Sequence, residues 1–510
     1  MATTVHAERT VGGVIEAAAD AWGDKLAIDF GEASYSYSDL WSRGRRAAQV
    51  FVNQGVKRSD RVLVMLDNTI EFVDAWLGLA VMGAIQVPVN TEYLGGILRH
   101  QITDSEAWLM LVDERYLGRI ADLGADHGSL RRLLVSGSGE NPAGLECESW
   151  DRLFGGSQEM PRGSIVESAP YDVVAIMYTS GTTGPSKGVR IAHAHAFTYA
   201  MLAGKTVQLK ADDIYFAPLP LFHIAGQWAL VYASLQVGAT AIVRRRFSVT
   251  DFWSVVRESG ATASFLLGAM ANFLARQEPR SDDADNPMER MLLVPLVDGL
   301  DDFRRRFNVR VCTCYGSTEV NVPIISGYDV TEPGVAGRAV PGFELRIVDE
   351  HDVDVPVGQV GELVVRTKEP WLLATEYHRN PEASLRLFRN LWLHTGDAFR
   401  RDVDDNYYFV DRIKDYIRRR GENISSFEVE REVNSHPAVL ESAAVAVRSA
   451  STEDDLKVVV VPKPGQSLDP EELRAFLRPR VPKFMVPDIV EVVSELPKTP
   501  TGKIQKHLLR

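Results

Sequence analysis

Segments with helical periodicity alternate with short runs rich in valine and isoleucine from about Val11 to Phe399. The run 62–66, the amphipathic segment 70–82 and the run 84–89 form one such unit. Because strand, helix and next strand repeat in this order, the pattern predicts layered α/β sheets with mostly parallel strands. From Gly342 onward the runs shorten and the turns come closer, which predicts a small β-rich subdomain.

The chain has 510 residues, which is too long for one simple domain. We expect a large N-terminal domain over 1–410, a hinge at 411–414 and a small, mobile C-terminal α+β domain over 415–510. In the small domain, helical patterns cover 426–436 and 469–476, and strand patterns cover 443–447 and 457–461.

The charge balance and the cysteines limit the partners and the compartment. A net charge of −13 argues against nucleic acid or an anionic membrane as the main partner. The most apolar early stretch, 72–89, contains Asp74 and Pro88, so no membrane span or targeting segment is expected. Three cysteines cannot form a disulfide framework, and Cys312 and Cys314, expected on one face of a strand, lack further zinc ligands. A cytoplasmic protein is predicted.

The segment 177–188 is rich in glycine and hydroxyl side chains and follows a β-branched run, so it is expected to be a loop that leaves a buried strand. Its glycines let the backbone fold closely around a ligand, and its hydroxyls with Lys187 suit phosphate oxygens. It is not a Walker A loop, because Ser186 stands where the second glycine belongs. A surface loop rich in turn residues is the alternative. The candidate ligand-binding residues are Thr179, Ser180, Gly181, Thr182, Thr183, Gly184 and Lys187.

This string resembles the phosphate loop of the adenylate-forming superfamily, which comprises acyl-CoA synthetases, luciferases and peptide-synthetase adenylation domains. Phe222–Ile224, Glu376–Tyr377 and 420–425 most resemble the carnitine/crotonobetaine-CoA ligase-like subgroup. The resemblance implies ATP, Mg²⁺ and CoA as cofactors and a small carboxylic acid as substrate. It is compatible with a monomer or a homodimer.

The resemblance also assigns roles in the nucleotide site. Tyr315 would stack on adenine, Thr318 would meet a phosphate and Glu319 would hold Mg²⁺, a task that suits a carboxylate. Asp397 would accept both ribose hydroxyls, and Arg412 would also contact the ribose. With the loop above, the candidate ATP-binding residues are Tyr315, Gly316, Ser317, Thr318, Asp397, Arg412 and Lys503.

Lys503 matches the family lysine that neutralises charge between the carboxylate and the α-phosphate. Such preorganised charge is typically worth about 3 kcal/mol, or ~10²–10³ in rate. Lys414 matches the hinge, Gly421 would lie beside the pantetheine, and Arg420 would meet a CoA phosphate, unless its basic run is simply solvated. Domain rotation about the hinge would withdraw Lys503 and present Gly421. The candidate catalytic residues are Lys503, Thr318, Glu319 and His223.

His223 resembles the family residue that lines the acyl pocket and gates a thiol tunnel, with a satisfied core histidine as the alternative. The segment 296–303 departs from the family, because relatives carry a longer glycine-rich loop there. Its Asp298 would suit a cationic acid, or it is a turn carboxylate. The candidate pocket residues are His223, Gly226, Val297, Asp298 and Gly299.

The leading functional prediction is ATP-dependent adenylation of a carboxylic acid followed by transfer to CoA. A second hypothesis keeps the adenylation but changes the acceptor, as in nitrite activation for diazotisation of an aryl amine, or in amide formation. A third, a non-catalytic nucleotide-binding protein, is disfavoured because the candidate residues Lys187, Glu319, Asp397, Arg412 and Lys503 are all present.

Overall fold

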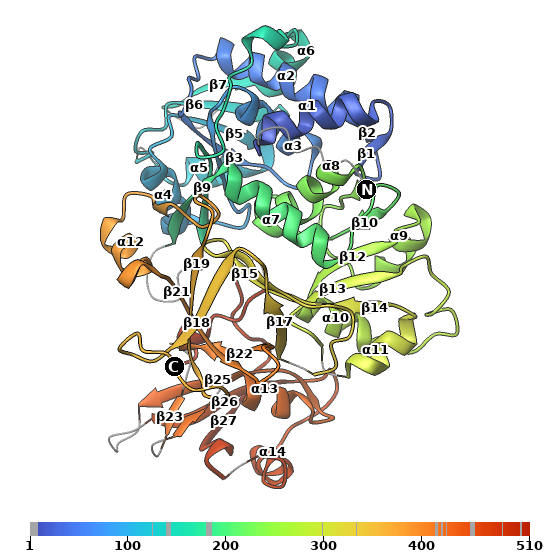
Figure 1. The fold of residues 1–510 in the computed structure, drawn as a ribbon, viewed down its shortest axis with the longest axis vertical. Coiled ribbons are helices and arrows are strands. Elements are labelled where there is room, and N and C mark those ends of the chain that lie inside the picture. Colours follow the sequence, from blue (N-terminus) through green and yellow to red (C-terminus); the bar gives the residue numbers. More distant parts are fainter. Residues whose placement is uncertain are drawn as a thin grey trace. The chain divides into compact units, whose positions relative to one another are not determined.

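A computed structural model describes residues 9–124, 126–138, 144–179, 186–297, 299–332, 334–413, 417–419, 422–424, 426–448, 454–481, 483–499 and 502–510 (Figure 1). The chain forms two compact units. Unit 1 comprises Met1–Pro333, Gly337–Glu344 and Arg366–Arg389, and unit 2 comprises Gly334–Ala336, Leu345–Val365 and Asn390–Arg510. The hinge expected at 411–414 remains a prediction, because Lys414 lies outside the described residues.

Unit 1 contains an eight-stranded sheet that carries both flanks of the glycine-rich segment. Its six strands from β8 to β7 pair in parallel, and β8, β9 and β20 pair antiparallel. In sheet order the strands are β20 (Glu376–Tyr377), β9 (Lys187–Ala192), β8 (Val173–Thr179), β4 (Ile85–Pro88), β3 (Arg61–Met65), β5 (Leu109–Asp113), β6 (Arg132–Ser136) and β7 (Glu146–Ser149).

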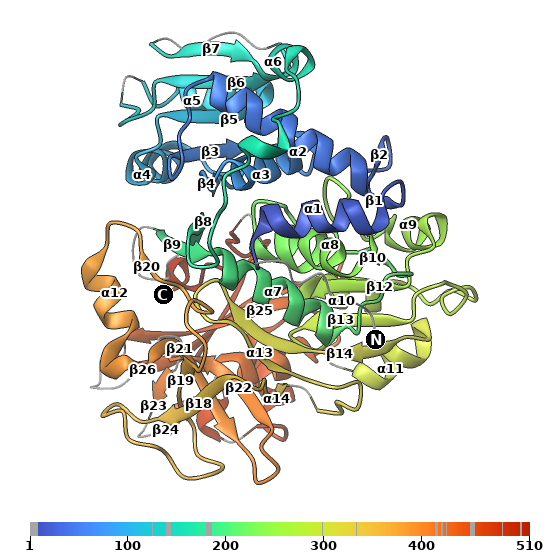
Figure 2. The same ribbon diagram turned by 45° about the horizontal axis from the view of Figure 1, so that its top comes forward.

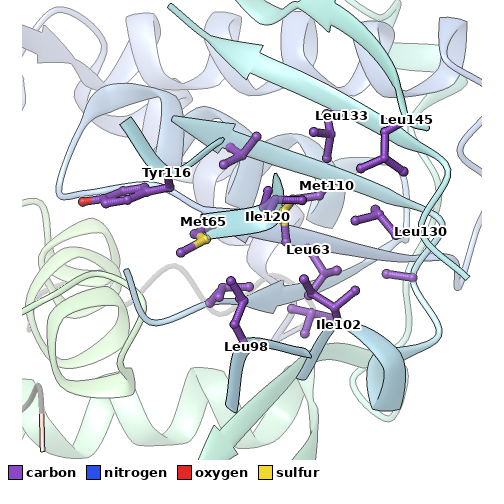
Figure 3. Close-up of a cluster of buried hydrophobic side chains, with 14 of the residues drawn as sticks. Leu63, Met65, Leu98, Ile102, Met110, Tyr116, Ile120, Leu130, Leu133 and Leu145 are labelled. Atoms are coloured by element: carbon purple, nitrogen blue, oxygen red, sulfur yellow. The ribbon is translucent and has the colours of Figure 1, made fainter. Parts of the chain in front are cut away.

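Both faces of this sheet are covered, which explains its continuous apolar strands. Figure 3 shows one face, where Leu63 and Met65 of β3 meet Leu98 and Ile102 of α4 (Gly95–Ser105) and Ile120 of α5 (Leu117–Ala121). Helix α3 (Ile70–Val81) contacts β4, and α1 (Val11–Trp22) and α2 (Tyr37–Asn53) contact α3; Figure 2 shows the three helices near one another. Helix α3 is buried on nearly every side, as a helix inside a layered domain must be.

A second, seven-stranded sheet of unit 1 is parallel except at the β1–β2 pair. Helix α7 (His193–Thr206) packs against the π-helix Ala225–Tyr232, which continues into α8 (Ala233–Val237). The strands in sheet order are β14 (Arg310–Cys312), β13 (Arg290–Val294), β12 (Ala263–Leu267), β10 (Ile214–Phe216), β11 (Thr240–Ile242), β1 (Leu26–Asp29) and β2 (Ser34–Ser36). Further helices are α6 (Trp150–Gly156), α9 (Phe252–Ser259), α10 (Gly268–Ala275), α11 (Leu300–Phe307) and α12 (Pro381–Leu387).

The predicted strand over Val309–Cys314 divides into two strands with different partners. Strand β14 ends at Cys312, and β15 (Cys314–Ser317) pairs antiparallel with β16 (Asn321–Ile325). Between them, Thr313 donates its hydroxyl to the Leu293 carbonyl oxygen at 2.7 Å. The prediction of one continuous strand over 309–314 is therefore wrong, and the shared face of the two cysteines stays a prediction. No disulfide joins the three cysteines, and burial raises the pKa of the Cys312 thiol to about 12.

Unit 2 combines antiparallel strands with an α+β core. Strand β21 pairs antiparallel with β19 and β22, and β25 pairs antiparallel with β26, which pairs in parallel with β27. Apolar side chains of α13 and α14 close the core over one face of the β25–β27 sheet. The elements are β19 (Gly361–Thr367), β21 (Leu393–Arg401), β22 (Tyr407–Arg412), β23 (Ile417–Arg419), β24 (Glu422–Ile424), α13 (Ser426–Asn434), β25 (Val439–Arg448), β26 (Asp454–Pro462), α14 (Pro470–Leu477) and β27 (Ile489–Val492). Strands β17 (Val335–Ala339) and β18 (Phe343–Val348) contribute residues to both units.

The predicted fold class, layered mostly parallel sheets with a smaller C-terminal α+β part, is confirmed. In the part of the chain that the structure describes, no helix has the length and hydropathy to cross a membrane.

Candidate functional site

The glycine-rich segment connects two antiparallel strands of the first sheet. Strand β8 continues to Thr179, and Lys187 already belongs to β9, where the two residues face each other in register. The two strands therefore extend into both ends of the segment 177–188, which is expected from the sequence to be a loop. Gly188 is needed for this pairing, because a Cβ there would lie 2.7 Å from Ile176 Cγ2. Ser180, Gly181, Thr182, Thr183 and Gly184 lie outside the described residues.

The carboxylate of Glu319 is the centre of the polar contacts beside this hairpin. Its Oε1 accepts hydrogen bonds from Tyr377 OH at 3.0 Å and from Thr179 Oγ1 at 3.4 Å. Its Oε2 accepts one from Ser317 Oγ at 3.2 Å. Three hydroxyls from three strands thus converge on one carboxylate and fix its orientation.

This arrangement suits a nucleotide-bound Mg²⁺, which usually takes one or two carboxylates and fills its other positions with water and phosphate oxygens. The described residues contain no group of three or more His, Cys, Asp or Glu that could hold a metal ion by themselves. A metal carried in by a nucleotide fits Glu319, and a dedicated protein cage does not.

Tyr377 is a site residue whose role is not predicted from the sequence. Strand β20 pairs with β9, which places Tyr377 opposite Val189. Its ring centroid lies 4.9 Å from Lys187 Nζ, a cation–π contact, while its hydroxyl holds Glu319. Tyr377 therefore connects the loop lysine to the carboxylate. In the sequence, the Glu376–Tyr377 dipeptide indicates only a resemblance to a subgroup.

The hairpin that carries Tyr315 and Glu319 is held by a second unpredicted residue, Asn321. Its Nδ2 donates to the carbonyl oxygens of Leu372 at 2.9 Å and His195 at 3.2 Å, and the residue is fully buried at φ +68°. Tyr315 and Thr318 are also buried, with exposures of 8% and 7%. Gly316 is required, because a Cβ there would lie 2.4 Å from the Asn321 carbonyl oxygen.

His223 lies at the start of the π-helix that forms one side of the candidate acyl pocket. Its Nδ1 accepts a hydrogen bond from the Ala225 amide at 3.2 Å. Gly226 sits against the preceding loop so tightly that a Cβ would lie 2.3 Å from the Pro220 carbonyl oxygen. Asn68, unpredicted from the sequence, fixes that loop through the Leu219 carbonyl oxygen at 2.9 Å and the Leu221 amide at 2.7 Å.

The remaining pocket candidates are only partly described. Val297 is fully buried, and Gly299 at φ +68° precedes α11. Asp298, on which the cationic-substrate hypothesis depends, lies outside the described residues.

The candidate ribose pair lies within unit 2. Asp397 of β21 and Arg412 of β22 are register partners, with Arg412 Nε 3.5 Å from Asp397 Oδ1. The Asp397 side chain is 9% exposed and that of Arg412 is 46% exposed. The buried carboxylate is therefore paired with a half-exposed cation, and two ribose hydroxyls are suitable donors to it.

Lys503 lies on a short turn near the end of unit 2. Its amide donates to Thr499 Oγ1 at 3.1 Å, and its carbonyl oxygen accepts from the Thr499 amide at 2.7 Å. Gly502, at φ +79°, allows this turn. Lys503 itself is exposed. Lys414, Arg420 and Gly421 lie outside the described residues.

The turn is anchored three residues further on. Lys506 Nζ lies 2.8 Å from the buried carboxylate of Glu430 and also contacts Ser426 Oγ. Ser426 in turn donates from its amide and its hydroxyl to Asp411 Oδ2, each at 2.6 Å. The segment that carries Lys503 is thus fixed to α13 and to the end of β22.

The fold, with a glycine-rich β-hairpin in a layered α/β part and a lysine-bearing turn in a small α+β part, defines the class of adenylate-forming enzymes. The chain belongs to the AMP-binding enzyme family, which it matches over residues 15–377, and it matches the AMP-binding enzyme C-terminal domain over residues 428–503.

Individual relatives agree with this assignment. The chain is 31% identical over 504 residues to crotonobetaine/carnitine–CoA ligase of Salmonella agona (strain SL483), which covers 96% of this chain and 97% of the relative. Among solved structures, ATP-bound MatB from Rhodopseudomonas palustris is 26% identical, with a TM-score of 0.87 and 98% coverage of both chains. The anthranilate CoA ligase AuaEII, solved with anthranoyl-AMP, shares the fold with a TM-score of 0.90 at 23% identity, over 100% of this chain and 98% of that one.

Proposed function

We propose that this protein is an AMP-forming acid–CoA ligase. In the first half-reaction a carboxylate oxygen attacks the α-phosphorus of ATP and pyrophosphate leaves. In the second, the thiol sulfur of CoA attacks the acyl carbonyl and AMP leaves. The observation that carries the proposal is the arrangement around the Glu319 carboxylate in a chain of this family. The carboxylate accepts hydrogen bonds from three hydroxyls, and one of these belongs to Tyr377, whose ring contacts Lys187.

The residues would divide the work between nucleotide binding and charge stabilisation. Glu319 would hold the Mg²⁺ that screens the phosphates, and Lys187 with the hairpin loop would bind their oxygens. Asp397 would accept the ribose hydroxyls, and Lys503 would neutralise charge as the adenylate forms. No protein nucleophile is needed, because positioning and electrostatics carry this kind of displacement.

The acceptor and the small domain's movement complete the proposal. A rotation about 411–414 would exchange Lys503 for the segment around Gly421, so that the thiol can approach. His223 and the residues near Asp298 would select the acid. We further propose that the protein acts in the cytoplasm, and that it is a monomer or a homodimer. Light scattering coupled to size-exclusion chromatography would measure the oligomeric state.

Pyrophosphate release across a panel of acids, with and without CoA, tests the function. The panel comprises crotonobetaine, carnitine, benzoate, anthranilate and o-succinylbenzoate, because named relatives are ligases of these acids. Nitrite with an aryl amine is included as well. We expect acid-dependent AMP formation that gives a thioester only with CoA. If turnover occurs with nitrite and the amine and does not depend on CoA, the diazotising alternative replaces the ligase. If no pyrophosphate is released under any condition, the protein is a non-catalytic nucleotide-binding protein.

A further inference from the structure

Strand β21 is irregular at the candidate ribose carboxylate. His394 is the register partner of Val364, whereas Ala398 is the partner of Glu362, so three residues of β21 oppose the single residue Leu363. Bulges of this kind bend a strand and re-aim its side chains, and they are common beside active sites. The direction of Asp397, the third bulged residue, is therefore set by whatever holds the bulge.

Side chains on β19 and β21 hold it. Glu362 Oε1 accepts a hydrogen bond from the Gly396 amide at 2.9 Å. Thr395 Oγ1 donates to the Leu363 carbonyl oxygen at 2.7 Å and accepts from the Asp397 amide at 3.1 Å. Gly396 adopts φ +70°, a conformation that glycine takes at little cost. The backbone N–H of Gly396, the residue before Asp397, is thus tied to a carboxylate of the neighbouring strand.

That carboxylate is itself oriented by His394. The imidazole Nδ1 lies 2.9 Å from Glu362 Oε2, and Nε2 lies 3.8 Å from Asp352 Oδ1. The His394, Asp352 and Glu362 side chains are only 8%, 12% and 16% exposed. Because an ionised carboxylate only accepts, Nδ1–H must be the donor. One oxygen of Glu362 then faces His394 while the other holds the bulge.

We propose that Glu362 and His394 are positioning residues for ribose recognition. They act through the Gly396 amide, and fix the bulge in the form that presents the Asp397 carboxylate to the sugar hydroxyls. The inference rests on the proposed function, in which Asp397 binds the ribose. The two oxygens of Glu362 are already engaged by the Gly396 amide and by His394, so the effect of removing either side chain would be transmitted by backbone geometry.

The test is the selectivity of the full-length protein for ribose over deoxyribose. Binding of ATP, 2′-deoxy-ATP and 3′-deoxy-ATP with Mg²⁺ would be measured by calorimetry, which requires no acid substrate. A hydrogen bond to a charged group gives about 10- to 100-fold selectivity for ATP over each deoxy analogue in the native protein. A change that merely loosens the sheet weakens all three nucleotides alike and leaves this ratio unchanged.

Six variants, five single and one double, separate the outcomes. Asp397→Ala should reduce the ratio to about threefold or less, and Glu362→Ala should approach the same value. Adding Glu362→Ala to Asp397→Ala should lower it no further, because both act on one contact. Glu362→Gln keeps an oxygen for the Gly396 amide, and His394→Asn keeps a donor near Nδ1, so both should retain most of the selectivity. If Glu362→Ala does not fold, His394→Ala, compared with His394→Asn, carries the test.

Glu491→Ala is the matched control, since it removes a carboxylate of unit 2 that pairs with Lys457 at 2.7 Å on β26. It should keep the native ratio. Native selectivity in Glu362→Ala and His394→Ala, with selectivity lost in Asp397→Ala, would overturn the positioning inference. Native selectivity in Asp397→Ala would instead overturn the ribose assignment within the proposed function.

Discussion

Replacing Tyr377 with phenylalanine removes one hydroxyl from the candidate Mg²⁺ site and keeps the ring beneath Lys187. The lost hydrogen bond is 3.0 Å long, ends on a carboxylate and lies on a residue that is 8% exposed. Hydrogen bonds to charged groups contribute about 1.5–3 kcal/mol, so a value near 2 kcal/mol gives a loss of about 30-fold in kcat/KM for ATP. The loss in kcat/KM should become smaller as the Mg²⁺ concentration is raised. The variant disturbs only the orientation of Glu319, the candidate Mg²⁺ ligand, and keeps the contact between the ring and Lys187.

The assay is acid-dependent pyrophosphate release over a range of Mg²⁺ concentrations, with an acid that the panel identifies. Tyr328→Phe is a matched control, because Tyr328 makes the same two kinds of contact elsewhere. Its hydroxyl donates a hydrogen bond to the Val207 carbonyl oxygen at 2.8 Å, and the Arg310 guanidinium lies 4.6 Å from its ring centroid. It should behave as the native protein. If Tyr377→Phe stayed within threefold of native at every Mg²⁺ concentration while Glu319→Gln was inactive, the hydroxyl would not orient the carboxylate.

Three further predictions concern the lysine turn and the interior of unit 1. Lys503→Ala should cripple adenylation yet leave thioester formation from a supplied acyl-adenylate largely intact in single-turnover assays, and equal loss of both would contradict the domain rotation. Asp74→Ala leaves the guanidinium of Arg43 without the carboxylate to which it donates hydrogen bonds at 2.6 and 2.8 Å. Chemical denaturation should therefore show that the free energy of unfolding falls by about 3–5 kcal/mol, whereas the Arg43→Met/Asp74→Leu double variant should recover most of this loss. Burial lowers the pKa of His193 and of His195 to about 4, so the unfolded chain binds more protons between pH 6.5 and 4. The free energy of unfolding should therefore fall as pH drops through that window, by up to ~3 kcal/mol for each histidine, and a slope unchanged in His195→Gln would refute the assignment for that residue.

The sequence was sufficient wherever structure follows from local periodicity. The segment predicted as a helix over 70–82 is α3, and the run 84–89 contains β4, because the spacing of apolar residues records which face of each element is buried. The same holds for the helix expected over 426–436, which is α13. Layered α/β architecture then follows from the order of the elements.

The features that escaped prediction depend on partners far away in the chain. Thr313 ends one strand because it bonds to Leu293, and no pattern within 309–314 contains that information. Tyr377 reaches Glu319 only because β20 pairs with β9, nearly two hundred residues earlier. The bulge before Asp397 is a mismatch between two strands, and a single strand cannot reveal it. The roles assigned by resemblance to Lys503, Asp397 and the pocket residues remain predictions.

The π-helix Ala225–Tyr232 gives the candidate acyl pocket an unusual evolutionary freedom. Such a stretch holds one more residue than the α-helix that would replace it, so a one-residue deletion there can be absorbed by a return to α-helical bonding. In a helix that stayed α-helical, the same deletion would turn the preceding segment by about 100° and draw it in by about 1.5 Å relative to α8, and the change of bonding avoids most of this displacement. His223 and Gly226 lie at that leading end. Single-codon deletions, and not only substitutions, can therefore change the residues at this end of the π-helix while the elements on either side keep their places.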